Sequence, residues 1–126
     1  MREIRLSAPC YPTEDRDRIT RSMKSIFPDA EFNDEGSITA VASSFEVFAE
    51  LLKRQRIRDA ARRVMRRHMH GRATSFRLNK QVAVIGKVSF SEEEHPLGDI
   101  EVTITADDLE SLIDEIAPRT GLKVSR

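Results

Sequence analysis

The sequence predicts a single α+β domain in which helices pack on one face of a largely antiparallel sheet. Its 126 residues suffice for one hydrophobic core, and Leu, Ile, Val and Phe account for 32 of them, a share typical of folded chains. Apolar residues recur every second residue in some segments and every three to four residues in others. The strand-like segments come in runs, which favours antiparallel pairing. We expect the order βαββααβββα over residues 1–118 and a tail at 119–126.

The first half of the domain begins with a strand at 3–8, where apolar and polar residues alternate. An amphipathic helix follows, with Thr13 as its expected N-cap and Pro28 as its end. Short alternating segments at 30–32 and 38–42 flank a turn of the residue types that hairpins use. This part of the chain is therefore expected to add a hairpin to the first strand.

Two helices come next, and we expect a break between them near Arg54 to Arg56. Ser44 is the expected cap of the first helix, and Gly71 the expected end of the second. The apolar stripe that ends at Leu52 and the stripe that begins at Ile57 differ by about half a turn of azimuth. A single straight helix would therefore bury opposite faces in its two halves.

A second hairpin is expected from strands at 76–78 and 82–90. A three-residue loop of Asn79, Lys80 and Gln81 places the larger apolar residues of both strands on one face, whereas a two-residue turn does not. The remaining elements are an exposed connection at 91–99, a strand at 100–105 and a helix that Asp107 caps and Pro118 ends. The apolar positions of all these elements form the expected core.

The chain has no net charge, yet its charges are strongly segregated. From Lys53 to Lys87 there are twelve Lys or Arg residues and one acid, Asp59, which gives a net charge of +11 and leaves −11 for the rest. Basic clusters of this kind are typical of sites for phosphate-rich partners. The acidic remainder keeps the chain soluble.

Several classes of protein are disfavoured by what the sequence lacks. It has no apolar run near the ~18 residues that a membrane span needs and no signal-peptide pattern. Its single cysteine, Cys10, cannot form an intrachain disulfide. No CxxC or HExxH ligand set and no convergent nucleophile and base are visible. We therefore expect a cytoplasmic protein that is not an enzyme and uses no metal or cofactor.

The first candidate binding site is the polar face of the second helix of the pair, which carries five arginines: Arg58, Arg62, Arg63, Arg66 and Arg67. Planar guanidinium groups on adjacent turns suit successive phosphates of one strand. The alternative is a solvated helix face, but such faces usually interleave charges of both signs, and this one contains almost no acid. The arrangement favours a phosphate-bearing partner.

The second candidate is the expected loop of Asn79, Lys80 and Gln81, whose side chains all donate hydrogen bonds and could enter a groove. Ordinary turn chemistry is the alternative. Arg77 and Lys87, on the polar side of the flanking strands, extend the same surface.

The composition also indicates which nucleic acid is bound. With no Trp and one Tyr, the chain offers few aromatic rings for stacking single-stranded bases, and it lacks the RNP signature. Structured RNA, recognised through its backbone phosphates and shape, is the expected partner. The alternative is a protein-interaction module whose basic helix docks on an acidic surface of a partner protein or of a second copy, which would give a homodimer.

Three segments resemble a known family: YPTED at 11–15, LLKRQRIRDAAR at 51–62 and SFRLNKQVAVIGKVSF at 75–90. In these segments the chain is similar to the archaeal uncharacterised protein family 0201, whose small members are classed as predicted RNA-binding proteins. The resemblance implies RNA binding, a link to RNA processing by the archaeal exosome, and a fold similar to that of the fifth large-subunit ribosomal protein.

Overall fold

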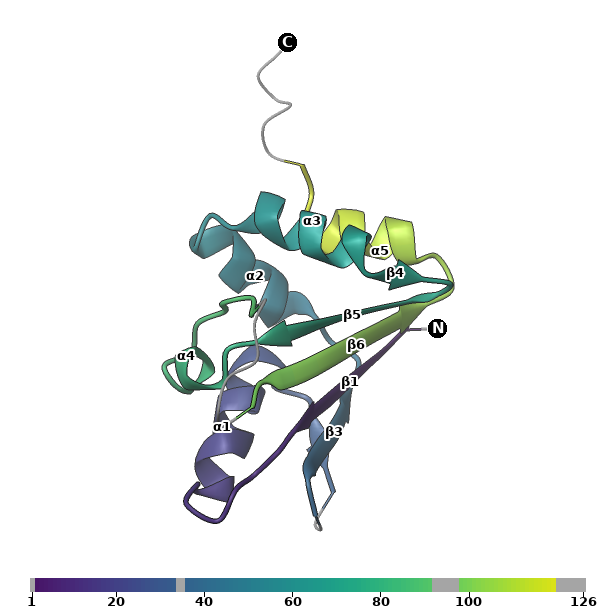
Figure 1. Cartoon of the computed structure of the whole chain (residues 1–126). Coiled ribbons are helices and arrows are strands. Elements are labelled where there is room, and N and C mark those ends of the chain that lie inside the picture. The colour runs from purple at the N-terminus through teal and green to yellow at the C-terminus, as the bar shows by residue number, and fades with distance from the viewer. Residues whose placement is uncertain (1, 34–35, 92–97, 120–126) are drawn as a thin grey trace.

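The computed structural model describes residues 2–33, 36–91 and 98–119, and these residues form one mixed α/β domain (Figure 1). Its elements, in chain order, are β1 (Arg2–Ala8), α1 (Arg16–Ile26), β2 (Glu31–Phe32), β3 (Ile38–Ala42), α2 (Glu46–Arg54), α3 (Arg58–Arg67), β4 (Met69–His70), β5 (Ala73–Leu78), α4 (Lys80–Val84), β6 (Ile100–Ala106) and α5 (Leu109–Ile116). Apart from Arg119, the expected tail lies outside the described residues.

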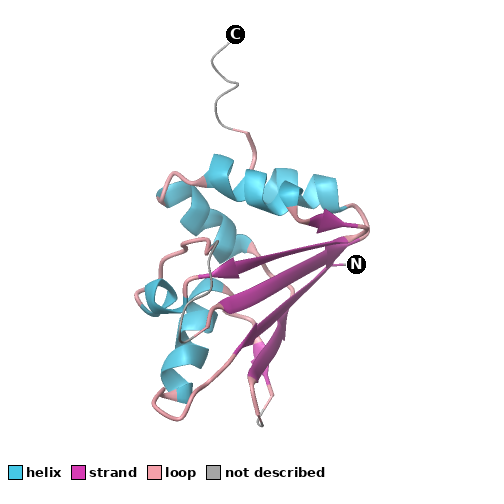
Figure 2. Cartoon of the chain, in the orientation of Figure 1, coloured by secondary structure: helices cyan, strands magenta, loops and turns pink. Residues whose placement is uncertain are grey.

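All six described strands belong to one sheet, in the order β2-β3-β1-β6-β5-β4, and every pair is antiparallel. The helices lie on one side of this sheet (Figure 2). Alternate residues of each long strand are accordingly buried, as in β6, whose Ile100, Val102, Ile104 and Ala106 face the core. The expected fold class is confirmed. Each helix in the described ranges is too short or too polar to span a bilayer.

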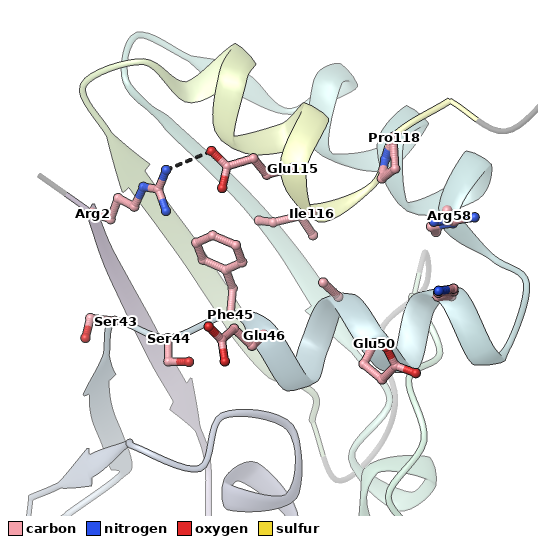
Figure 3. A pocket seen from close by; sticks show the side chains of 12 residues that line it. Arg2, Ser43, Ser44, Phe45, Glu46, Glu50, Arg58, Glu115, Ile116 and Pro118 are labelled. Atoms are coloured by element: carbon pink, nitrogen blue, oxygen red, sulfur yellow. Dashed lines mark hydrogen bonds and ion pairs between the residues drawn. The ribbon is translucent and has the colours of Figure 1, made fainter. Parts of the chain in front are cut away.

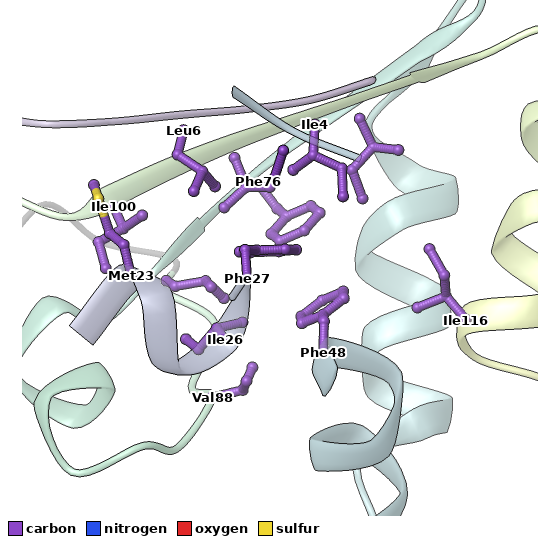
Figure 4. Close-up of a cluster of buried hydrophobic side chains, with 14 of the residues drawn as sticks. Ile4, Leu6, Met23, Ile26, Phe27, Phe48, Phe76, Val88, Ile100 and Ile116 are labelled. Atoms are coloured by element: carbon purple, nitrogen blue, oxygen red, sulfur yellow. The ribbon is translucent and has the colours of Figure 1, made fainter. Parts of the chain in front are cut away.

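The core lies between the sheet and the helices, and aromatic rings link its parts (Figure 4). The ring of Phe48 in α2 lies 5.4 Å from that of Phe27, which follows α1, and 5.8 Å from that of Phe76 in β5. Aromatic pairs at such distances add to the stability that burial alone provides. These contacts fix α1 and α2 on the sheet.

The expected break between the two helices is confirmed. α2 ends at Arg54, α3 begins at Arg58, and Arg56 between them has φ 59°, a backbone conformation that L residues with side chains seldom adopt. The Gln55 side chain holds the break in place: its Nε2 donates to the Val88 carbonyl at 2.7 Å, and its Oε1 accepts from the Val88 N–H at 2.8 Å. The segment after α4 is thereby fastened beside the α2–α3 junction.

The expected hairpin after Leu78 is wrong. Residues Lys80–Val84 form the short helix α4, and β5 pairs instead with β6 and β4. The Asn79 side chain caps this helix by accepting from the Val82 N–H at 2.9 Å. Lys80 and Ala83 are both buried. Their spacing of three residues is that of a helix, and the segment is helical although its valines alternate like those of a strand. A single bridge, between Leu78 and Phe90, joins β5 to the segment that follows α4.

The helix and strand boundaries also differ from the expected ones by a few residues. Asp15 caps α1 where Thr13 was expected, and Asp108 caps α5 where Asp107 was expected. Each neighbouring residue is a good capping type, so the sequence alone did not distinguish them. Gly71, with φ 64°, lies in the turn between β4 and β5 because Met69 and His70 leave the helix to form an edge strand.

The start of α2 has no side-chain cap, and Asp29 instead holds the two residues that precede its N-cap. Phe45 occupies the N-cap position where Ser44 was expected. Asp29 Oδ2 accepts from the N–H groups of Ser43 and Ser44 at 2.9 and 3.1 Å and from the Ser43 hydroxyl at 3.1 Å. Desolvation raises the pKa of Asp29, but these hydrogen bonds together outweigh it and hold the pKa below its usual value.

Asp29→Asn is therefore expected to lower the melting temperature at pH 7 and to have a diminishing effect in acid. A carboxyl whose pKa is lowered by folding stabilises the protein above its unfolded pKa of about 3.9, and that stability is lost as pH falls through the lower folded pKa. Thermal melts of both proteins between pH 7 and pH 2.5 measure this. A melting difference that stays constant over the whole range would contradict the assignment.

Candidate functional site

The five arginines of α3 do not form one free surface, because helical spacing divides them into two rows. We call Arg58, Arg62 and Arg66 the inner row and Arg63 and Arg67 the outer pair. α5 packs against α3, and the two helices run side by side (Figure 1). The inner row faces α5, whereas the outer pair is exposed to solvent.

Two arginines of the inner row, Arg62 and Arg66, form ion pairs with acids of α5. Arg62 Nη1 lies 2.6 Å from Asp114 Oδ1 and donates to the Ala117 carbonyl at 3.3 Å. Arg66 Nη1 lies 3.1 Å from Glu110 Oε1. The acids are spaced four residues apart, as are the arginines, so one ion pair forms on each of two successive turns of the two helices. The Arg62 side chain is only 14% exposed, which leaves little of it for a partner.

The third arginine of the inner row, Arg58, lines a hollow between α2 and α5 (Figure 3). One end of the hollow is closed by an ion pair between Arg2 and Glu115 at 2.9 Å, and the Arg2 guanidinium also lies over the Phe45 ring. Glu50 and Lys53 line it as well. Charges of both signs surround this hollow, so it offers no selectivity for anions.

The division of the α3 arginines into an inner row and an outer pair can be tested with one substitution in each. Arg62→Ala is expected to lower the free energy of unfolding by about 1–2 kcal/mol, since it removes a half-covered ion pair, a hydrogen bond to the end of α5 and apolar packing by the side-chain stem. Arg63→Ala, in the same helix, is expected to change it by less than ~0.5 kcal/mol. Urea denaturation of both variants measures the difference, and equal values would show that the inner row does not hold α5.

Three further exposed cations lie around the α2–α3 junction, at the N-terminal end of α3; sequence reasoning named one of them, Lys87, and missed the other two. Lys53 and Arg56 at the α2–α3 junction are exposed, and neither makes an ion pair within the described residues. Lys87 is exposed too, and the Gln55–Val88 hydrogen bonds bring it next to this junction. We call Lys53, Arg56 and Lys87 the junction cluster. The α2–α3 break was the signal that could have pointed to it.

Of the other candidate residues, Lys80 is not available to a partner. Only 5% of its side chain is exposed. Its ammonium donates to the Pro9 carbonyl at 2.9 Å and to Glu14 Oε1 at 3.1 Å, and it lies 5.7 Å from the centre of the Tyr11 ring. It is the anchor of the β1–α1 loop, a role that the expected hairpin concealed.

The other residues expected in this site differ in their exposure and in their contacts. Asn79 is occupied as the cap of α4, whereas Gln81 is exposed. Arg77 is half-buried on the open face of the sheet, in register with Glu101 of β6. The residues of the expected second binding site are thus dispersed, with Gln81 exposed in the first turn of α4.

Together the outer pair and the junction cluster give five exposed cations along α3 and its N-terminal end. The ten residues of α3 extend for about 15 Å, over which one nucleic acid strand carries about four phosphates. In the part of the chain that the structure describes, no group of three His, Cys, Asp or Glu residues is placed to hold a metal ion.

Comparison with known proteins places the chain in a family. A family model described as RNA binding matches residues 3–106. A UPF0201 protein of Methanothermobacter thermautotrophicus is 34% identical over 122 residues, covering 94% of this chain and 92% of the relative. The chain belongs to the archaeal UPF0201 family. Another member, from Methanocaldococcus jannaschii, is 39% identical over 127 residues and covers 94% and 74% of the two chains.

Solved structures of UPF0201 proteins share this fold. The crystal structure of the Methanococcus jannaschii member is 36% identical, covers 98% of both chains and superposes with a TM-score of 0.88. A second UPF0201 crystal structure, 34% identical, gives 0.87 with 94% of both chains covered. One relative is longer: the chain spans 38% of a UPF0200/UPF0201 protein of Archaeoglobus fulgidus that it matches at 35% identity.

Proposed function

We propose that this UPF0201 protein is a noncatalytic, cytoplasmic RNA-binding protein that holds structured RNA through its backbone phosphates. The observation that carries the proposal is the division of the α3 arginines. The acids of α5 occupy Arg62 and Arg66, while the outer pair and the junction cluster stay exposed without ion pairs within the described residues. The match of residues 3–106 to a model described as RNA binding supports the same conclusion.

Structured RNA is favoured over single strands because stacking platforms are scarce. Among the described residues, Tyr11 is the one aromatic residue with a largely exposed side chain, and sequence-tolerant single-strand binders need several such rings. Recognition of phosphates and helix shape requires none. A role in RNA processing beside the archaeal exosome, as the family resemblance implies, is compatible with this mode of binding.

An acidic protein is the second candidate partner, and one observation favours it: the basic helix already docks on an acidic helix, the chain's own α5. That contact uses the inner row, however, and leaves the outer pair facing solvent. A duplex RNA presents closely spaced negative charge, and the outer pair and the junction cluster present exposed positive charge along α3 and at its N-terminal end. RNA is therefore the partner that we propose for this surface.

The proposal is tested by titrating a fluorescent RNA hairpin with a long stem at several KCl concentrations. If about four phosphates are neutralised, the logarithm of affinity falls against the logarithm of salt concentration with a slope of about −3 to −4. Polyglutamate of equal charge, added as competitor, distinguishes the two partners. Weak, salt-insensitive RNA binding together with tight polyglutamate binding would favour the acidic protein.

A further inference from the structure

A second hollow, of about 470 Å³, adjoins the C-terminal end of the α3 surface proposed for the RNA stem and lies between the end of α3 and the outer edge of β5. That edge is covered incompletely. β4 pairs with its first two residues, Ala73 and Thr74, and Phe90 bridges to its last, Leu78. The hollow opens between these two coverings, and its volume is within the range of small-molecule sites.

The side chains that line this hollow combine a cationic rim with an aromatic floor. Arg67, from the outer pair, and Arg77 of β5 both line it. Phe90 is half-buried, and its ring packs edge-on against Phe76, with centroids 5.5 Å apart and planes at 67°. Guanidinium groups bind phosphates, and aromatic rings bind nucleobases. A nucleotide carries both of these groups in one molecule.

A carboxylate completes the lining. Glu101 lies directly opposite Arg77 in the β5–β6 register, yet the two make no ion pair within the described residues. Both charged groups therefore remain able to bind a ligand. A carboxylate accepts hydrogen bonds from the amino groups of bases, and guanine presents two adjacent donors, N1–H and the N2 amino group, whereas uracil has no amino group.

We propose that this hollow binds one unpaired nucleotide of an RNA, with its phosphate between Arg67 and Arg77 and its base against Phe90, and that Glu101 favours guanine. The proposal rests on the proposed function, because the nucleotide belongs to the RNA that the α3 surface holds. Arg67 joins the two sites: it lies at the end of the outer pair and on the rim of the hollow. Structured RNA is commonly read at such unpaired, splayed-out bases.

Nuclear magnetic resonance titrations of the full chain with mononucleotides test the hollow independently of RNA stems. GMP is expected to shift the amide signals of Arg67, Ser75 and Phe90 and to bind at least about fivefold more tightly than UMP or ribose 5-phosphate. Equal binding of GMP and ribose 5-phosphate would overturn the proposal, because the hollow would then be an anion site only.

Variants give a second test. Glu101→Gln should abolish the preference for GMP over UMP, whereas Glu31→Gln, the same charge change at an exposed position of β2, should leave it intact. Phe90→Leu keeps an apolar floor without a ring and should weaken GMP about tenfold, with a thermal melt to confirm folding. An unchanged GMP preference in Glu101→Gln, with Phe90→Leu binding as the natural chain does, would contradict the assignment.

Two RNA hairpins with the same stem connect the hollow to the proposed function. One stem ends blunt, and the other carries one unpaired guanosine at its end. The natural chain should bind the hairpin with the unpaired guanosine about tenfold more tightly, and Phe90→Leu should lose this gain while binding the blunt hairpin equally well. Equal affinities of the natural chain for both hairpins would overturn the nucleotide site alone. Failure to bind either hairpin, with GMP shifts still confined to the hollow, would overturn the α3 surface instead.

Discussion

Lys80→Met is expected to lower the free energy of unfolding by about 3–5 kcal/mol, the largest loss of stability that we predict for a single substitution. Methionine matches the stem of the side chain but removes its three donors. The Glu14 carboxylate, 13% exposed, and the Pro9 carbonyl then lose the ammonium that each contacts. A buried charge without its partner is strongly destabilising. Urea denaturation measures the loss.

Two further variants separate this structural role from phosphate binding by Lys80. Lys80→Met combined with Glu14→Gln should recover part of the loss, because an unpaired amide costs less to bury than a carboxylate. Gln81→Ala, at the exposed neighbouring position, should change stability by less than ~0.5 kcal/mol. If Lys80→Met were as stable as Gln81→Ala but bound RNA more weakly, Lys80 would be a phosphate ligand.

The second large effect concerns RNA affinity. A triple variant with Lys53→Gln, Arg63→Gln and Arg67→Gln, the outer variant, is expected to bind a structured RNA about 100-fold more weakly at low salt, since three phosphate contacts and their counterion release are lost. Its melting temperature should change little, because all three side chains are exposed. Fluorescence anisotropy with a labelled hairpin, together with a thermal melt, measures both quantities.

The matched control carries the same change of charge on another helix. Arg18→Gln, Arg21→Gln and Lys24→Gln together remove three exposed cations from α1, and this α1 variant should retain the RNA affinity of the natural chain. Equal losses in the two triple variants would mean that overall charge, and not the surface along α3, determines binding.

Much of the fold could be predicted because local patterns and tertiary packing agree in the first half of the chain. The strand at 3–8, the hairpin at 30–42 and the break near Arg56 all follow from apolar spacing, and the structure contains each of them. The prediction for the segment after Asn79 was wrong because its valines alternate like those of a strand. The buried positions Lys80 and Ala83 instead have helical spacing, which becomes visible only once a lysine is counted as buried.

The division of the arginine face could not be predicted for a different reason. The acids that neutralise Arg62 and Arg66 lie 52 and 44 residues further along the chain, so the face looks free of acids in the local sequence. Only the docking of α5 brings Asp114 and Glu110 beside it. The matching spacing of four residues in both helices was present in the sequence, but nothing local placed the helices together.

The salt dependence of RNA affinity in the natural chain and in the outer variant tests the central claim most directly. The claim is that the outward cations along α3 bind phosphates, while the inner row holds α5. It predicts that the slope of log affinity against log salt flattens by about 2.5 to 3 in the outer variant, close to 0.9 for each lost phosphate contact. Identical slopes for the natural chain and the outer variant would contradict it.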